Sequence, residues 1–177
     1  MALDETFWAG LRTQFLNAPD QIYLNTGSWG VMPRPVHDAY LARLRELELN
    51  PTRNRGPLRE QQAEARSTLS EFMNIQGEDV AFLPNVTAAI NLVINGLDWE
   101  EGDEILTTDQ EYGAILNCLH NAATRWKVRV VSAEIPIPPT CPDDILNPIG
   151  ASFTPRTKLV VCSHITTRTG IITPIAE

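Results

Sequence analysis

Residues 104–132 read EILTTDQEYGAILNCLHNAATRWKVRVVS and carry the clearest fold signal in the chain. The stretch begins with a predicted strand over Glu104–Thr107, continues with a helical pattern over Tyr112–Trp126 and ends with a second predicted strand over Val128–Ser132. A strand, a helix and a second strand of these lengths are typical of a crossover between parallel strands. The stretch therefore predicts a parallel sheet that is covered by helices.

The same alternation continues on both sides of this stretch. Before it, the sequence predicts a strand over Val80–Leu83 and a helix over Thr87–Leu97. After it, a weaker helix is predicted over Asp143–Phe153 and a strand over Lys158–Cys162. We therefore predict an α/β fold with a mostly parallel sheet. Because ligands bind at the carboxyl ends of the strands in such sheets, we expect the polar loops that follow three of these strands to line one binding edge.

The N-terminal part has a mostly helical pattern. Phe7, Leu11 and Phe15 recur every four residues and predict a helix that ends before Pro19. A short strand is predicted next, over Ile22–Leu24.

Two further helices are predicted from the positions of prolines. Pro33 and Pro35 precede a helical period that starts at Val36, since proline is tolerated in the first turn of a helix. The next helix is predicted to begin at Pro57 and to end at Gly77.

The charge balance limits the classes of partner. The 177 residues carry a formal net charge of -8 at pH 7, with a pI near 4.9. An acidic protein repels nucleic acid and anionic membrane surfaces, so neither is a predicted partner. There is no secretory signal and no apolar run of membrane-span length, so a cytoplasmic location is expected. The three cysteines and three histidines follow neither a disulfide nor a metal-ligand pattern, and no metal is predicted.

The turn LPNVT at residues 83–87 lies between a predicted strand and a predicted helix. Asn85 or Thr87 can cap this helix by accepting hydrogen bonds from its first free N–H groups. The same N–H groups, with a threonine hydroxyl among them, also form a site for a phosphate. The turn by itself leaves both roles open.

Four segments, in order, resemble the class V group of pyridoxal 5'-phosphate (PLP) enzymes, which share the aminotransferase fold. The segments are YLNTGSWGVMPRPV at 23–36, NVTAAIN at 85–91, DQEYGAILN at 109–117 and SHITTRTGIITPIAE at 163–177. The first of them fits the isopenicillin N epimerase-like branch best. The resemblance implies a three-layer, aspartate aminotransferase-like PLP-transferase large domain with a mostly parallel sheet. It also implies PLP as the cofactor, a small amino acid as the substrate and a homodimer.

The resemblance assigns a role to each matching residue. It implies that Val86 and Thr87 bind the cofactor phosphate, and that the Tyr112 ring stacks on the pyridine ring. It implies that Thr167 donates a hydrogen bond to the phenolic oxygen of the cofactor, a role that Thr166 can share. The residues that it places on the substrate side are Asn25, Ser28 and Trp29.

The family's Schiff-base lysine has no match in this sequence. The two lysines, Lys127 and Lys158, precede or begin predicted strands and therefore lie at the wrong ends to meet the cofactor. The resemblance places the catalytic lysine beyond Glu177. We therefore expect the N-terminal part of a larger enzyme, inactive by itself, with a helical arm and entry segment over 1–60 and an incomplete, truncated PLP-binding large domain over 61–177.

Three functions follow from these observations. Epimerase-like or C–S lyase-like chemistry on an amino acid is favoured, because the first of the four segments fits the epimerase-like branch. A cysteine desulfurase or selenocysteine lyase-like enzyme is the nearest alternative. A non-catalytic protein is the third. It could be an α/β binding module, although the sequence contains neither a G-x-G-x-x-G nor a G-x-x-x-x-G-K-[ST] motif, or a free-standing fragment with only a partner-binding role.

Overall fold

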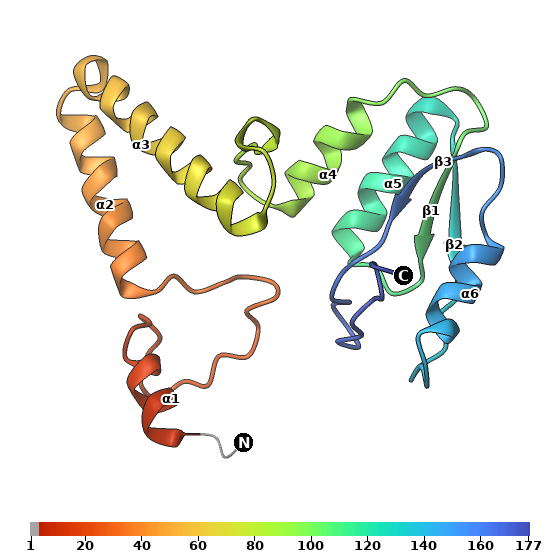
Figure 1. The fold of residues 1–177 in the computed structure, drawn as a ribbon, viewed down its shortest axis with the longest axis horizontal. Helices are drawn as coiled ribbons and strands as arrows, with labels where there is room; N and C mark the ends of the chain where they lie inside the picture. Colours follow the sequence, from red (N-terminus) through yellow and green to blue (C-terminus); the bar gives the residue numbers. More distant parts are fainter. Residues whose placement is uncertain (1–3) are drawn as a thin grey trace. The chain divides into compact units, whose positions relative to one another are not determined.

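The computed structural model describes residues 4–177 (Figure 1). The chain divides into two compact units, with the division between Ala81 and Phe82. The domain boundary predicted at residue 60 refers to the whole protein, and it stays a prediction. None of the helices within residues 4–177 combines the length and the apolar character that a membrane crossing requires.

Helices make up the first unit. They are α1 Glu5–Arg12, α2 Arg34–Leu49, α3 Pro51–Met73 and the 3-10 helix η1 Gly77–Asp79. Asp4 caps α1, because its carboxylate accepts a hydrogen bond from the N–H of Phe7 at 3.1 Å. Asn50 caps α3 in the same way, by accepting from the N–H of Arg53 at 3.0 Å. As predicted, α1 ends before Pro19.

The prolines of this unit behave differently from one another. α2 begins at Arg34, two residues before the predicted start at Val36, and Pro35 lies in its first turn as predicted. The prediction that Pro57 opens a helix is wrong, because Pro57 lies inside α3. That helix starts earlier because Asn50 supplies its cap and Pro51 occupies the first turn, where a missing N–H breaks no hydrogen bond.

Two predicted strands do not form within residues 4–177. Neither Ile22–Leu24 nor Val80–Leu83 pairs with another strand. Ile22 and Leu24 are instead exposed to solvent. A strand needs a neighbour that satisfies its backbone N–H and C=O groups, and a local apolar pattern cannot supply one.

The second unit alternates helices and strands. Its elements are α4 Val86–Asn95, β1 Glu104–Thr108, α5 Gly113–Trp126, β2 Arg129–Ala133, α6 Asp143–Ala151 and β3 Thr157–Val161. The sequence predicts each of them, with ends displaced by a residue or two. The agreement is close because apolar residues recur with the spacing of a strand in some segments of this unit and with the spacing of a helix in the others.

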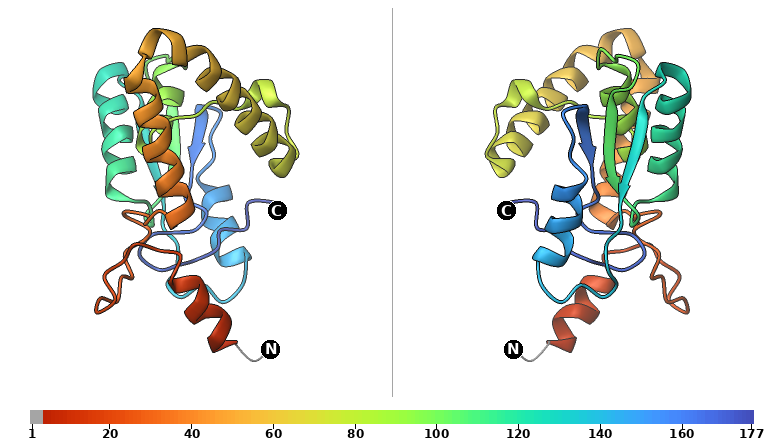
Figure 2. Two further views of the ribbon diagram at one scale, coloured as in Figure 1. Left: turned by 90° about the vertical axis from the view of Figure 1, so that its left-hand side faces the viewer. Right: turned by 90° about the vertical axis from the view of Figure 1, so that its right-hand side faces the viewer.

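The three strands form a parallel sheet in the order β2-β1-β3. In this register, Glu104 of β1 lies beside Arg129 of β2 and Thr157 of β3. The crossovers from β1 to β2 and from β2 to β3 run in opposite directions across the sheet. Because such crossovers are right-handed, α5 and α6 cover opposite faces, as Figure 2 shows. The predicted α/β fold with a parallel sheet is confirmed.

The main core lies between the sheet and the pair of helices α4 and α5. Ile94 of α4, Ile105 of β1 and Leu119 of α5 are fully buried there, and Val161 of β3 is largely buried beside them. Burial of each such side chain contributes about 1.5–3 kcal/mol. This core holds α4 and α5 against the sheet.

Candidate functional site

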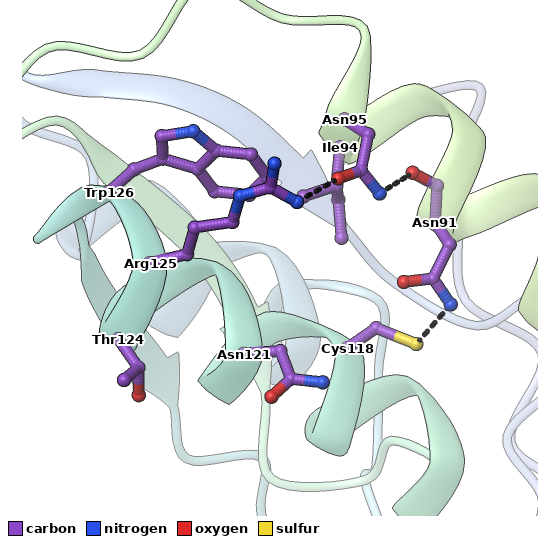
Figure 3. Close-up of a pocket in the computed structure, with 8 residues that line it drawn as sticks. All are labelled: Asn91, Ile94, Asn95, Cys118, Asn121, Thr124, Arg125 and Trp126. Carbon is purple, nitrogen blue, oxygen red and sulfur yellow. Dashed lines mark hydrogen bonds between the residues drawn. The ribbon is translucent and has the colours of Figure 1, made fainter.

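A ladder of polar contacts aligns α4 with α5. Asn91 on α4 donates a hydrogen bond to the Sγ of Cys118 on α5 across 3.0 Å. Further along both helices, Arg125 on α5 donates to the Oδ1 of Asn95 on α4 across 3.2 Å. Figure 3 shows these side chains around a pocket of about 290 Å³ between the two helices. Residue numbers rise together along the ladder, so α4 and α5 run parallel.

This alignment places the start of α4 at the carboxyl edge of the sheet. Val86 and Gly113 are the first residues of α4 and α5, and each precedes its ladder residue by five positions (91 − 86 and 118 − 113). α5 begins just beyond the carboxyl end of β1. The N-terminus of α4 therefore lies at the same edge as the loop that follows β1, as Figure 1 shows.

Asn85, and not Thr87, caps α4. The side-chain oxygen of Asn85 accepts a hydrogen bond from the N–H of Ala88 at 2.9 Å. Within residues 4–177, no hydrogen bond is made by the N–H groups of Val86 and Thr87 or by the half-buried Thr87 hydroxyl. The helix thus has its cap and still presents two N–H donors and one hydroxyl, which together suit an anion.

Tyr112 occupies the N-cap position of α5 but makes no capping hydrogen bond with its side chain. It is 45% exposed at the carboxyl edge of the sheet. Its neighbour in sequence, Glu111, is only 4% exposed. The ring of Tyr112 is therefore accessible, while the backbone that carries it is anchored by a buried carboxylate.

Two carboxylates tie the loop after β1 to the loops on both sides of it. Asp109 accepts a hydrogen bond from the N–H of Ile135, in the loop after β2, at 3.0 Å. Glu111 accepts two from Ser163, in the loop after β3: one from its N–H at 2.9 Å and one from its hydroxyl at 2.5 Å. Glu111 also accepts from the hydroxyl of Thr108 at 2.9 Å. The three strand-end loops are thus connected through side chains of the central loop.

The Glu111 carboxylate also influences Cys162. Burial raises the pKa of the Cys162 thiol above its usual range, and the negative charge of Glu111 raises it further. This thiol therefore forms its thiolate less readily than an exposed cysteine does.

Thr166 and Thr167 lie in the loop after β3 but differ in their surroundings. Thr166 is buried, and its hydroxyl accepts from the N–H of Ile171 at 2.9 Å and shares a hydrogen bond with the Thr169 hydroxyl at 2.8 Å. Thr167 is exposed, and its hydroxyl makes no hydrogen bond within the described part of the chain. Of the two, Thr167 has the hydroxyl that is available to a ligand.

The predicted substrate-side residues form a tight turn in the first unit. The carbonyl of Asn25 accepts from the N–H of Ser28 at 3.1 Å and of Trp29 at 3.2 Å. The hydroxyl of Tyr23 holds the turn by sharing its one hydrogen between the carbonyls of Asn25, at 3.1 Å, and Trp29, at 2.7 Å. Their role toward a substrate stays a prediction.

Five of the predicted residues come together at one edge of the second unit. They are Val86, Thr87, Tyr112, Thr166 and Thr167. Both lysines belong to the opposite edge, as predicted, because Lys127 ends α5 and Lys158 is the second residue of β3.

Glu111 and Ser163 were not among the residues predicted from the sequence. Both lie inside segments that resemble the family, but a glutamate in a polar loop is usually a solvated surface residue. Only the chain's return through β3 brings Ser163 to Glu111, so no local pattern marks this pair.

Comparisons with known proteins agree on one family. The profile of the family described as Aminotransferase class-V matches residues 22–177. The chain is 34% identical to isopenicillin N epimerase from Amycolatopsis lactamdurans, over 96% of this chain and 43% of that protein. It is 27% identical to a probable cysteine desulfurase from Methanothermobacter thermautotrophicus, over 89% of this chain and 40% of that protein.

A solved structure shares the fold. A mutant of C-DES, with glycine covalently linked to its PLP cofactor, is similar with a TM-score of 0.80 and 27% identity. The similarity covers 93% of this chain and 43% of that one. The chain thus spans about 43% of the length of the epimerase from Amycolatopsis lactamdurans and of this solved structure.

Proposed function

Because the chain belongs to the class V aminotransferase family, we propose that it supplies the phosphate-binding side of a PLP-dependent enzyme that acts on an amino acid. The observation that carries the proposal is the N-terminus of α4. It is already capped by Asn85, yet it presents the N–H groups of Val86 and Thr87 and the Thr87 hydroxyl at the ligand-binding edge of the sheet.

These donors fit the phosphate ester of PLP. The N-terminus of a helix carries roughly half a positive charge, which favours an anion there. The two free N–H groups point along the helix axis toward such a ligand, and the Thr87 hydroxyl adds a third donor. Neither Val86 nor Thr87 has to break a hydrogen bond within the described residues in order to bind it.

Two other residues would hold the ring of the cofactor. The exposed ring of Tyr112 would stack on it, and the free hydroxyl of Thr167 would donate to its phenolic oxygen. Thr166 would support Thr167 through the loop that its own hydroxyl stabilises. When bound, PLP withdraws electrons from the α-carbon of an amino acid, which weakens the bonds at that carbon.

The favoured chemistry is epimerase-like or C–S lyase-like. The epimerase from Amycolatopsis lactamdurans matches with the higher identity and along more of this chain, which favours the first. A second solved structure, of the cystine C–S lyase C-DES, supports the second. The probable cysteine desulfurase keeps a desulfurase or selenocysteine lyase-like enzyme as the alternative. Incubation of the full-length protein with amino acids separates the two: change at the α-carbon alone supports an epimerase, and sulfur release from cysteine or cystine supports a lyase or desulfurase.

The 177-residue chain by itself is proposed to be inactive. Lys127 and Lys158 lie at the edge of the sheet opposite to Thr87. Borohydride reduction of the chain with PLP should therefore leave no stoichiometric label on either lysine, and such a label would contradict the proposal. The homodimer and the cytoplasmic location stay predictions.

The test separates phosphate binding from helix capping in the full-length protein. Thr87→Ala removes one hydrogen bond to a charged group, worth about 1.5–3 kcal/mol, so PLP affinity should fall about tenfold or more. Thr87→Ser should restore most of it. Asn85→Ala is the matched control, because it removes the cap and should lower the stability of the apo-protein by about 1 kcal/mol. A Thr87→Ala protein that holds PLP as tightly as the parent would overturn the phosphate site.

A further inference from the structure

The buried carboxylate of Glu111 is the least expected group at the carboxyl edge of the sheet. Glutamate is rarely buried unless it is paired, because an ionised carboxylate loses its hydration. Among residues 4–177, no lysine, arginine or histidine forms an ion pair with Glu111. It is held instead by three hydrogen bonds, from the Thr108 hydroxyl and from the N–H and hydroxyl of Ser163.

These bonds connect two segments of the proposed cofactor site. Glu111 directly precedes Tyr112, and Ser163 begins the loop that contains Thr166 and Thr167. The two partners are 52 residues apart in sequence. Both oxygens of the carboxylate are used, so Ser163 is held in position as well as in orientation.

The loop that Ser163 begins is itself braced. The hydroxyl of Thr173 donates to the carbonyl of Ser163 at 2.7 Å, and the Nδ1 of His164 donates to the carbonyl of Thr173 at 2.7 Å. The hydroxyl of Thr166 binds the backbone of Ile171 within the same loop. A displacement of Ser163 would therefore be transmitted to the residues between these contacts, Thr167 included.

We propose that Glu111 is a positioning residue of the cofactor site, which sets the distance between Tyr112 and Thr167 so that both reach one bound PLP. The inference rests on the proposed function. Glu111 acts through these two residues and does not itself contact the cofactor. The site then includes a residue pair, Glu111 and Ser163, that joins the loop carrying Tyr112 to the loop carrying Thr167.

A second buried carboxylate on the same strand provides a matched control. Glu104 is 2% exposed and lies at the amino end of β1, at the opposite edge of the sheet. It accepts a hydrogen bond from the Thr154 hydroxyl at 2.5 Å and pairs with Arg129 at 3.2 Å. Loss of either carboxylate removes buried hydrogen bonds, but only Glu111 contacts the proposed cofactor loops.

The experiment compares these variants in the full-length protein. Melting of the apo-protein reports stability, and titration with PLP gives its dissociation constant together with the visible circular dichroism of the bound cofactor. Glu111→Ala and Glu104→Ala should both lower the melting temperature. Glu111→Ala should also weaken PLP binding about tenfold or more and change the circular dichroism, whereas Glu104→Ala should leave both unchanged.

Two milder variants cover the case in which Glu111→Ala does not fold. Glu111→Gln keeps a side chain that can bond both Thr108 and Ser163, so its PLP affinity should stay near that of the parent. Ser163→Ala removes one of the three hydrogen bonds and should weaken PLP binding several-fold. Amide hydrogen exchange in the apo-protein should rise in residues 109–113 and 163–171 together for Ser163→Ala, but not for Glu104→Ala.

The outcomes distinguish this inference from the proposed function. A parent protein that does not bind PLP overturns both. A parent that binds PLP, with Glu111→Ala and Ser163→Ala binding equally well, overturns only the role of Glu111. Equal weakening by Glu104→Ala also overturns it, because the effect would then come from general loss of stability.

Discussion

Lys158 donates a hydrogen bond to the carboxylate of Asp103 across 2.9 Å, at the edge of the sheet opposite to Thr87 and Tyr112. The pKa of Asp103 is lowered, first by the backbone N–H of Glu100 and then by Lys158. The pKa of Lys158 is raised by its hydrogen bond to Asp103. The amine is therefore held as a charged structural group.

We expect this pair to stabilise the protein in a defined pH range. The contribution of Asp103 is present above its ordinary pKa of 3.8 and is lost as pH falls through its lower folded-state pKa. The contribution of Lys158 is present below 10.5 and is lost as pH rises through its higher folded-state pKa. The melting deficit of Lys158→Met should therefore be largest between these limits and shrink in acid.

The control for this prediction is Lys127→Met. Lys127 pairs with Glu101 at 3.4 Å, and both side chains are largely exposed, so its loss should change the melting temperature little at any pH. A Lys158→Met deficit that is the same in acid as at neutral pH would contradict the assignment.

Asn91 is expected to stabilise the pairing of α4 with α5. Its amide donates to Cys118 at 3.0 Å and to the carbonyl of Thr87 at 3.0 Å. Asn91→Ala should lower the free energy of unfolding by about 1–2 kcal/mol in urea denaturation. Asn121→Ala is the control, since this exposed side chain lines the same pocket but should change stability by less than about 0.5 kcal/mol. Equal losses in the two variants would rule out a specific role for Asn91.

The three cysteines are expected to react with iodoacetamide at different rates. Cys141 is exposed and should react first. Cys162 should be slower, because burial and Glu111 raise its pKa and so reduce its thiolate at pH 8. Cys118 is buried and should be slowest. Peptide mass mapping at successive times measures the three rates.

Loss of the charge at Glu111 should accelerate Cys162 selectively. Glu111→Gln removes a negative charge that raises the pKa of Cys162, so more thiolate forms at the same pH. The rate at Cys141 serves as the internal control and should not change. A Cys162 rate that is unaffected by Glu111→Gln would show that burial alone sets this pKa.

The Tyr112 ring should matter more than its hydroxyl. Tyr112→Phe keeps the stacking surface, so PLP affinity in the full-length protein should change less than about threefold. Tyr112→Ala removes the ring and should weaken binding about tenfold. Because Tyr112 is partly exposed, neither change should lower apo-protein melting much. Equal affinity in all three proteins would remove Tyr112 from the site.

The sequence alone determined the order of elements in the second unit. β1, α5 and β2 have clear local periodicity, which depends only on residues a few positions apart. The polar loops could be placed at one edge of the sheet because the strands of a parallel sheet all end at the same edge. The sequence also limited the N-terminus of α4 to two roles, capping and phosphate binding.

The sequence allowed either Asn85 or Thr87 to cap α4, and the local backbone geometry of the folded chain decided between them. Asn85 bonds Ala88, and this leaves Thr87 available. Tertiary structure decided that Val80–Leu83 forms no strand, because a strand needs a neighbouring strand and a local sequence pattern does not identify one. The clearest case is Glu111, whose burial depends on donors of Ser163, 52 residues away. Hydrogen-bond partners across such distances are set by the path of the whole chain, so only the folded structure shows them.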